Sequence, residues 1–224
     1  MAADHASHQS AEEPGLRADA ERNRRRILDA ARAVFAEAGL DTPLEAIAQR
    51  AGVGIATLYR RFPTRQALIE EVFSSRLEQA VQAAAEALAI EDAWEGFATY
   101  LWRLCAMQAE DFGVRDLLTT TFSSARGLEE TRKRGHTLAT QLIDRAKAQG
   151  SLRADFSPED LLFLLIANRA FVAATSRVKR TAWKRYVALF LEGCRADRAH
   201  ALPEPPLSER QMFRAMLALS AHHR

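Results

Sequence analysis

The sequence has little of what most enzymes, metalloproteins and membrane proteins need. It contains only two cysteines in 224 residues, Cys105 and Cys194, and their separation matches no metal-binding spacing. The six histidines lack the grouping of a metal site or catalytic triad, and no Gly-rich phosphate-binding motif is present. No apolar run is long enough to span a membrane, and the N-terminus lacks a signal-peptide core. These absences predict a cytoplasmic, non-enzymatic chain with reduced thiols and neither metal nor cofactor.

Positive and negative charges nearly balance over the whole chain, but they are unevenly distributed. The formal net charge of the chain is +2, whereas residues 22–65 hold nine arginines and no lysine against four acidic residues, a local net charge of +5. A small basic segment on a nearly neutral chain indicates contact with a polyanion. Arg22, Arg24, Arg25 and Arg26 crowd the start of the first expected helix, where the macrodipole disfavours cations. Nearby phosphates explain this cluster, and a solvated basic end is the alternative.

Helical periodicity dominates the chain and predicts an all-α fold. Residues 1–18 are polar and unpatterned, which predicts a disordered tail. Thr42 is expected to cap a short helix, with Pro43 at its first position and Glu45 completing a capping box. Capping and stop signals divide the rest of the chain into further expected helices, at about residues 19–38, 55–62, 64–88, 93–109, 114–122, 128–149, 158–176, 181–195 and 208–221.

Residues 42–68 contain two short helices joined at Gly52, the arrangement of a helix-turn-helix motif. In the second helix Leu58 and Phe62 share one face and can anchor it, which leaves the other positions free to enter a DNA major groove. Hydroxyl and guanidinium groups there suit phosphate oxygens and base edges. The expected DNA contacts are Arg24, Thr42, Gly54, Ile55, Ala56, Thr57, Tyr59, Arg60, Arg61, Thr64 and Arg65.

The run AIAQRAGVGIATLYRRFPTRQALIEEV resembles the DNA-binding domain of the TetR family of bacterial transcriptional regulators. The matching elements are Ile47-Ala48, Ala51-Gly52-Val53, Thr57-Leu58-Tyr59 and Phe62-Pro63-Thr64-Arg65, and the similarity spans roughly residues 22–75. Gly54 and Ile55 depart from the family, which usually has Ser or Thr followed by a polar residue. A thymine methyl group is the natural partner of Ile55. The resemblance implies a three-helix DNA-binding head at residues 19–66 and a helical ligand-binding and dimerisation domain at residues 67–224.

The resemblance also implies a homodimer, because the last two long helices of family members pair with the same helices of a second subunit. Residues 161–174 are apolar around nearly the whole helix, and residues 183–194 carry an apolar stripe. A fully internal core explains this apolar surface equally well without the resemblance. The expected interface residues are Leu165, Phe171, Val172, Trp183, Tyr186, Val187, Phe190 and Cys194.

A small-molecule cavity is the third implication of the resemblance. Core packing is the alternative for most of the apolar candidates, and a surface position is the alternative for His136. Asn168 and Arg169 are the strongly polar residues of an apolar helix, and a buried arginine needs an anionic or carbonyl partner. The expected lining is Phe97, Leu101, Trp102, Cys105, Phe122, His136, Asn168 and Arg169.

Together these features predict a homodimeric, ligand-responsive transcriptional repressor that binds a palindromic operator in double-stranded DNA. Its effector is an unidentified small molecule, and no membrane is involved. One alternative is an all-α small-molecule-binding or enzymatic protein whose head is not used on DNA. The other is a DNA-architectural protein without effector control.

Overall fold

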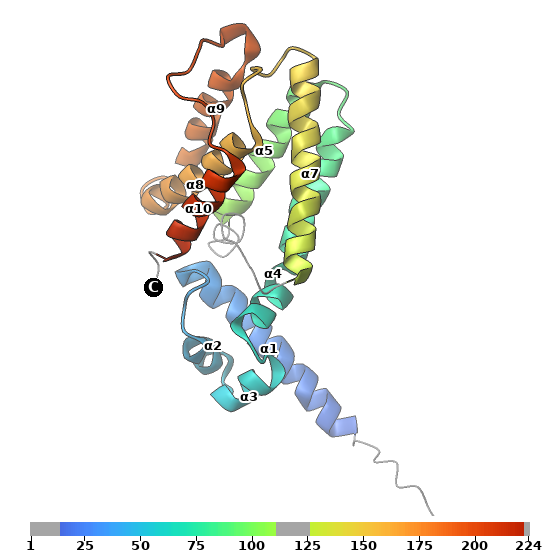
Figure 1. The fold of residues 1–224 in the computed structure, drawn as a ribbon. Helices are drawn as coiled ribbons and strands as arrows, with labels where there is room; N and C mark the ends of the chain where they lie inside the picture. The colour runs from blue at the N-terminus through green and yellow to red at the C-terminus, as the bar shows by residue number, and fades with distance from the viewer. Residues whose placement is uncertain (1–13, 111–125, 222–224) are drawn as a thin grey trace, which may run out of the picture.

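The computed structural model describes residues 14–110 and 126–221, and helices make up the regular structure of these ranges (Figure 1). The all-α expectation is confirmed. A small N-terminal head lies at one end of a larger helical body, and helix α4 runs from one into the other. A single antiparallel bridge between Leu152 and Arg195 is the extended pairing recorded in these ranges.

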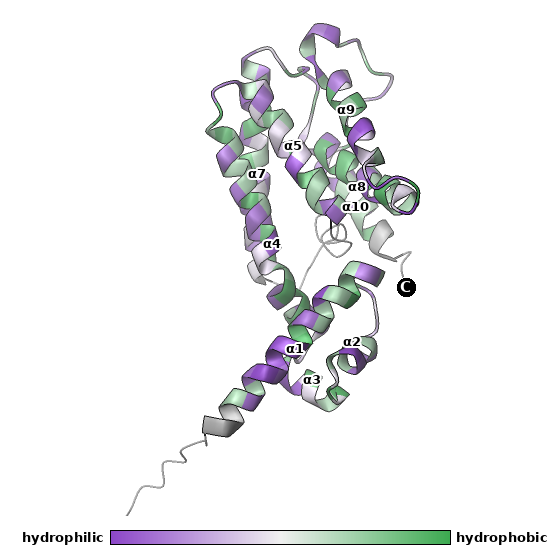
Figure 2. Cartoon of the chain, turned by 180° about the vertical axis from the view of Figure 1, so that it is seen from behind, coloured by the Kyte–Doolittle hydropathy of each residue, from purple (hydrophilic) through white to green (hydrophobic). Residues whose placement is uncertain are grey.

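The head consists of α1 (Pro14–Ala38), α2 (Leu44–Ala51), α3 (Ile55–Arg61) and the first turns of α4 (Arg65–Leu88). Its core is built from large apolar side chains of all four helices, among them the fully buried Phe35 and Phe73, whose ring centroids lie 5.8 Å apart. The first half of α1 is largely hydrophilic and extends past α3, away from the body (Figure 2).

Two expectations about the head's helix starts are wrong. Helix α1 begins at Pro14, upstream of the expected start at about residue 19 and within the expected disordered tail. Helix α2 has Pro43 at its N-cap position and no side-chain cap. The Thr42 hydroxyl instead donates to the Gly39 carbonyl at 2.9 Å, so it closes the turn before the helix and is not used as the cap. The expected residues at the other boundaries are confirmed: Gly52 ends α2 with φ 63°, and the Thr64 side chain caps α4 by accepting from the Ala67 N–H.

The body contains α5 (Ala93–Glu110), α7 (Arg126–Ala148), α8 (Pro158–Thr175), α9 (Ala182–Cys194), a short 3₁₀ turn η1 (Ala196–Arg198) and α10 (Glu209–Ala221). The expected helix at residues 114–122 lies outside the described residues. Ser157 and Asp160 form the capping box that opens α8, as the sequence predicts. Aromatic rings of Trp94, Phe97, Phe156 and Phe190 follow one another through the body core, with centroids 5.4–6.3 Å apart.

Helix α4 belongs to both hydrophobic cores. Its first half supplies Leu68, Val72 and Phe73 to the head, and its second half supplies Ala80, Ala84 and other alanines to the body. Small side chains there let α5 and α7 approach α4 closely. Arg145 of α7 fixes the end of α4 by donating to the backbone carbonyls of Leu88, Ile90 and Glu91. The end of α4 is therefore held by the body, and its beginning is part of the head.

Candidate nucleic-acid interface

Helix α3 separates buried from exposed side chains as the sequence predicts. Leu58 is fully buried, whereas Ile55 and Tyr59 are 37% and 45% exposed. Arg60 and Arg61 are exposed as well, and Thr57 is half-buried. Because residues four apart lie on one side of a helix, Ile55 and Tyr59 form an exposed ridge beside the face that Leu58 anchors. A seven-residue helix held by one central leucine presents nearly its whole outer surface to a partner.

The turn before α3 contains two glycines, Gly52 and Gly54, which differ in backbone conformation. Gly52 has φ 63°, and a Cβ there would lie 2.5 Å from Nη2 of Arg26, which also donates to the Gly52 carbonyl at 3.3 Å. Gly54 is the N-cap of α3 in an extended conformation, φ −68° and ψ 146°, and a Cβ added there would meet nothing within 4 Å. Gly52 is therefore favoured by its left-handed backbone conformation, since the Arg26 guanidinium can move aside, whereas Gly54 leaves room for the Ser or Thr that the resembled family usually carries.

Three of the expected DNA contacts also serve the head's own structure. Arg65 donates to the carbonyls of Leu40 and Thr42 at 2.9 and 2.6 Å, which ties the segment between α1 and α2 to the start of α4. Thr64 caps α4 and Thr42 closes the turn before α2. The phosphate contact expected of Arg65 stays a prediction, and at least one of its guanidinium nitrogens already has carbonyl partners.

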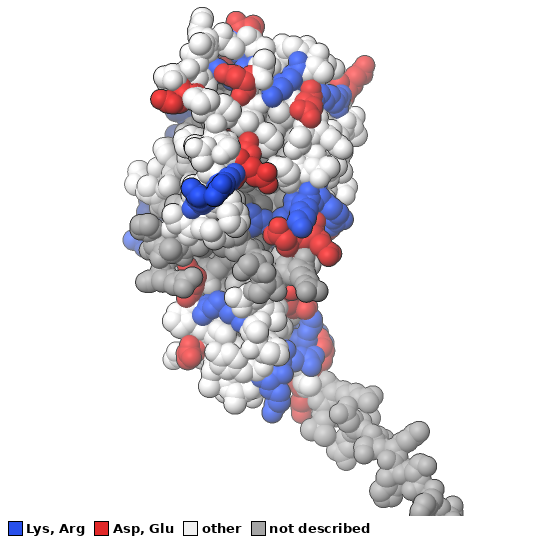
Figure 3. All heavy atoms as spheres, in the orientation of Figure 1, with Lys and Arg blue, Asp and Glu red and all other residues white. Residues whose placement is uncertain are grey.

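Arginines gather on the side of the head where α1 runs past α3, and acidic side chains lie among them (Figure 3). Arg24 of α1 pairs with Glu71 of α4, and Glu21 lies between Arg24, Arg25 and Arg61. Sequence reasoning singled out the arginines but missed Glu21. Its spacing to Arg24 and Arg25, three and four residues along a helix, is the signal that could have found it.

The residues expected at a dimer interface are mostly packed inside their own chain. Five of the eight are buried, while Phe171, Tyr186 and Phe190 are half-buried, and the Phe171 and Tyr186 rings stack 5.5 Å apart. Phe163 of α8 and Leu189 of α9 are instead 57% and 61% exposed. The expectation is corrected accordingly, because side chains already covered by their own core offer little surface to a partner. The five buried residues are Leu165, Val172, Trp183, Val187 and Cys194.

Among the described residues, the expected ligand contacts are divided between the body core and its surface, and their ligand role stays a prediction. Phe97, Leu101 and Cys105 are buried in the body core, and burial raises the pKa of the Cys105 thiol to about 12. Trp102 packs on Trp183 with ring centroids 5.7 Å apart. His136 is exposed on α7.

Of the remaining candidates, Arg169 is half-buried and engaged with other groups. Phe122 lies outside the described residues. Asn168 is fully buried.

Asn168 forms a buried amide pair with Gln108 of α5. The Asn168 Nδ2 donates to Gln108 Oε1 at 2.9 Å, and Gln108 Nε2 donates to the Leu165 carbonyl at 3.2 Å. Both residues are fully buried, and Asn168 Oδ1 has no hydrogen-bond partner among the residues that the structure describes. A buried acceptor left unpaired is unfavourable by about 1–3 kcal/mol, so this atom is a place where a hydrogen-bond donor would be stabilised. Gln108 was missed at the sequence level, although it is a polar residue at helical spacing from Leu101 and Cys105.

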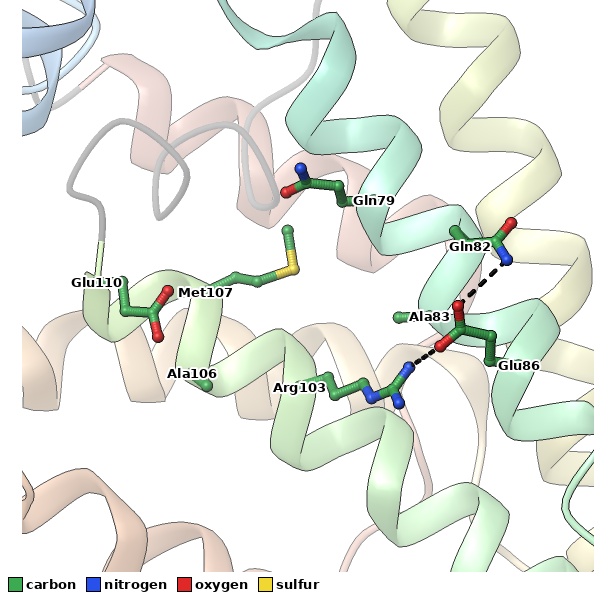
Figure 4. Close-up of a pocket in the computed structure, with 8 residues that line it drawn as sticks. All are labelled: Gln79, Gln82, Ala83, Glu86, Arg103, Ala106, Met107 and Glu110. Atoms are coloured by element: carbon green, nitrogen blue, oxygen red, sulfur yellow. Dashed lines mark hydrogen bonds and ion pairs between the residues drawn. The ribbon is translucent and has the colours of Figure 1, made fainter.

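A separate groove of about 320 Å³ lies between α4 and α5. Ala83, Ala106 and Met107 contribute apolar surface, and Glu86 at its edge accepts from Gln82 and pairs with Arg103 (Figure 4). The hydrogen bonds from Arg103 and Gln82 lower the pKa of the Glu86 carboxyl. None of the expected ligand-contact residues lines this groove. No helix within the described ranges is long and apolar enough to cross a membrane.

Two sequence families match the chain in succession. The tetR family of bacterial regulatory proteins matches residues 27–72, and the C-terminal domain of SbtR-like transcriptional regulators matches residues 92–196. The TetR transcriptional regulator SCO0520 from Streptomyces coelicolor is 33% identical over 77% of this chain and 98% of its own, with a TM-score of 0.49. No curated protein sequence matches the chain significantly.

The fold itself is shared with more distant proteins. The transcriptional regulator FadR from Bacillus subtilis, solved in complex with stearoyl-CoA, is 17% identical and has a TM-score of 0.58 over 79% of this chain and all of its own. A TetR-family regulator from Agrobacterium tumefaciens is also 17% identical, with a TM-score of 0.59 over the same shares. Both domain matches and the identity to the Streptomyces protein lead to one conclusion: the chain belongs to the TetR family of bacterial transcriptional regulators, DNA-binding transcription factors rather than enzymes.

Proposed function

We propose that this chain is a cytoplasmic, homodimeric repressor that binds an approximately palindromic operator through α3 and releases it when a small molecule binds the body. The observation that carries the proposal is the division of α3: Leu58 is fully buried while Ile55 and Tyr59 face outward. A helix anchored on one side, with hydroxyl, methyl and guanidinium groups on the other, suits insertion into a major groove.

The side chains of α3 divide the recognition task. Ile55, at the start of the helix, offers an apolar surface suited to a thymine methyl group. Tyr59 lies one turn later, and its hydroxyl suits a phosphate oxygen. Arg60 and Arg61 at the end of the helix can reach a phosphate or a guanine edge. We assign sequence discrimination to the first turn and most of the affinity to the last.

A homodimer is supported by the exposed apolar side chains of α8 and α9. Phe163 and Leu189 are the large exposed side chains, and Ala170, Ala173 and Ala174 on α8 are exposed with them. Large apolar side chains exposed on two neighbouring helices are typical of association sites. A two-fold arrangement of these helices would give one head for each half of a palindromic operator.

An effector with a hydrogen-bond donor is supported by Asn168. Its free Oδ1 accepts only, and its neighbours Cys105, Gln108 and Leu165 are all fully or almost fully buried. We therefore propose an uncharged, largely apolar effector that carries a hydroxyl or N–H group. The proposal does not use Arg169, whose expected anionic or carbonyl partner need not be a ligand, because Arg169 is half-buried and already engaged.

The experiment is selection of duplexes from a random pool by the full-length protein, followed by fluorescence anisotropy at stated salt. Arg61→Ala should weaken binding to the selected duplex at least about tenfold, because it removes a phosphate or base contact. Arg32→Ala is the matched control, an exposed arginine of α1 paired with Asp29, and should change little. Failure to select any duplex, or equal losses in the two variants, would refute the proposed interface.

The same samples test the dimer by light scattering. Leu189→Glu should convert the protein to monomers, because a charge in the α8–α9 face cannot be covered. Leu202→Glu is the control, since Leu202 is 57% exposed but lies in the segment between α9 and α10. A wild-type monomer that still binds the selected duplex tightly would argue against the two-fold arrangement.

A further inference from the structure

One carboxylate, that of Glu21, lies within reach of three arginines on the DNA-facing side of the head. Its Oε1 is 3.6 Å from Nη1 of Arg24 and 3.7 Å from Nε of Arg25, and its Oε2 is 3.9 Å from Nη2 of Arg61. Arg25 and Arg61 are 71% and 46% exposed, so solvent, and therefore a phosphate, can reach both. Glu21 is half-exposed at 45% and stands between them.

The contact with Arg61 sets Glu21 apart from an ordinary acid on a helix surface. The contacts with Arg24 and Arg25 are within one helix, where such spacing is common. Arg61 is the last residue of α3 and comes from a different helix. Arg24 also forms an ion pair with Glu71 of α4. The basic edge that α1 and α3 present together is thus partly neutralised by the protein's own carboxylates.

We infer that Glu21 is a positioning residue that competes with DNA phosphates for these arginines and thereby limits sequence-independent binding. The inference rests on the proposed DNA interface. A phosphate that approaches Arg25 or Arg61 must displace a carboxylate and then remain near its negative charge. Base contacts from Ile55 at the other end of α3 carry no such penalty. Glu21 therefore lowers the phosphate-driven part of DNA affinity, which is all that arbitrary DNA offers, while the base contacts of the operator are unaffected.

Loss of any negative charge strengthens DNA binding to some extent, so the test needs a variant with the same charge change elsewhere. Asp29 of α1 provides it. Its carboxylate is 74% exposed and pairs at 3.2 Å with Arg32, and it contacts no residue of α3 in the described structure. Asp29→Asn and Glu21→Gln thus alter the net charge equally on the same helix, but only the second releases an arginine of α3.

The experiment measures anisotropy of a fluorescein-labelled 30-bp duplex of arbitrary sequence with full-length protein, from about 50 to 200 mM KCl. An exposed ion pair is worth a few-fold at most in an equilibrium constant. Glu21→Gln should therefore lower Kd about three- to tenfold at the lowest salt, and clearly more than Asp29→Asn. An arginine freed to bind a phosphate releases about one more counterion, so log Kd should depend on log salt more steeply by roughly 1.

The duplex selected by the wild-type protein should gain affinity by a similar factor in Glu21→Gln, because it makes the same phosphate contacts. Arg61→Ala should cost more affinity for arbitrary DNA in the Glu21→Gln background than in the wild type, because the arginine is then free to bind. Equal effects of Glu21→Gln and Asp29→Asn, weaker binding by Glu21→Gln, or an unchanged cost of Arg61→Ala would each overturn the inference. Absence of wild-type binding to every duplex would instead overturn the proposed function.

Discussion

Truncation of Leu58 should show that the buried side of α3 determines stability, whereas its exposed side determines DNA affinity. Leu58 is fully buried and is the one buried residue within α3, which has no side-chain cap at Gly54. Leu58→Ala removes three buried carbons, about 2.4 kcal/mol at roughly 0.8 per carbon, and leaves a cavity besides. The expected loss in the free energy of unfolding is about 2–5 kcal/mol, and DNA binding should be lost with it.

Ile55→Ala is the matched variant, because it removes apolar carbons from the same helix at a position that is 37% exposed. Its cost in stability should stay below about 1 kcal/mol, while affinity for the selected duplex should fall about tenfold. Urea unfolding followed by circular dichroism gives the stability. Hydrogen exchange of residues 54–62 reports whether α3 has come loose locally. If Ile55→Ala destabilised the protein as much as Leu58→Ala, the assignment of inner and outer faces would be wrong.

Three further predictions concern the turn, the core thiol and a surface ion pair. Gly52→Ser should cost about 1–2 kcal/mol because its φ of 63° is unfavourable for any side chain, whereas Gly54→Ser should stabilise slightly through a better N-cap; both are read from urea midpoints. The Cys105 thiol, whose pKa burial raises to about 12, should resist iodoacetamide at pH 8 in the folded protein and react once unfolded; rapid native labelling would contradict the burial. The hydrogen bond from Arg50 lowers the pKa of Glu37 below its ordinary value of 4.5. The ionised Glu37 therefore stabilises the folded protein above pH 4.5, and this stabilisation is lost as the pH falls through the lowered pKa. The melting-temperature difference between wild type and Glu37→Gln should be larger at pH 7 than at pH 3.

The parts of the head that sequence reasoning located correctly are those fixed by short-range chemistry. Gly52 ends α2 in a left-handed conformation, which glycine adopts more easily than other residues. Thr64 directly precedes α4 and caps it with its own hydroxyl. Thr42 had the same residue type and spacing as a cap, but in the folded turn its hydroxyl donates to the Gly39 carbonyl and Pro43 occupies the N-cap position. A hydroxyl with two possible partners cannot be assigned from the sequence, because the choice depends on how the chain turns before the helix.

The body shows a different limit. The apolar stripe containing Trp183 and Val187 was correctly found, but periodicity does not say whether a stripe is covered by its own chain or by a second one. In the structure α9 packs that stripe inward and leaves Leu189 outside. Asn168 stood out because it is polar among apolar neighbours, whereas its partner Gln108 did not. Their pairing joins residues 60 positions apart, which no local pattern in one sequence reveals.

Helix α4 explains how an event in the body can reach the DNA. A ligand can weaken DNA binding only if it binds more tightly to the protein with its heads in the non-binding position than in the DNA-binding position. Each tenfold loss of DNA affinity requires a difference of about 1.4 kcal/mol between these two ligand-binding free energies. That difference requires an element that cannot move in one domain without moving in the other. Phe73 is fully buried in the head core and Ala84 is fully buried in the body core, and a continuous helix joins them. Neither half can rotate freely, since rotation would expose Phe73 or force a larger side chain into the space that Ala84 fills. Under the proposed function, the motion we expect is a tilt of α4 about the end held by Arg145, which would displace α3 because α3 is anchored by Leu58 to the same core as Phe73.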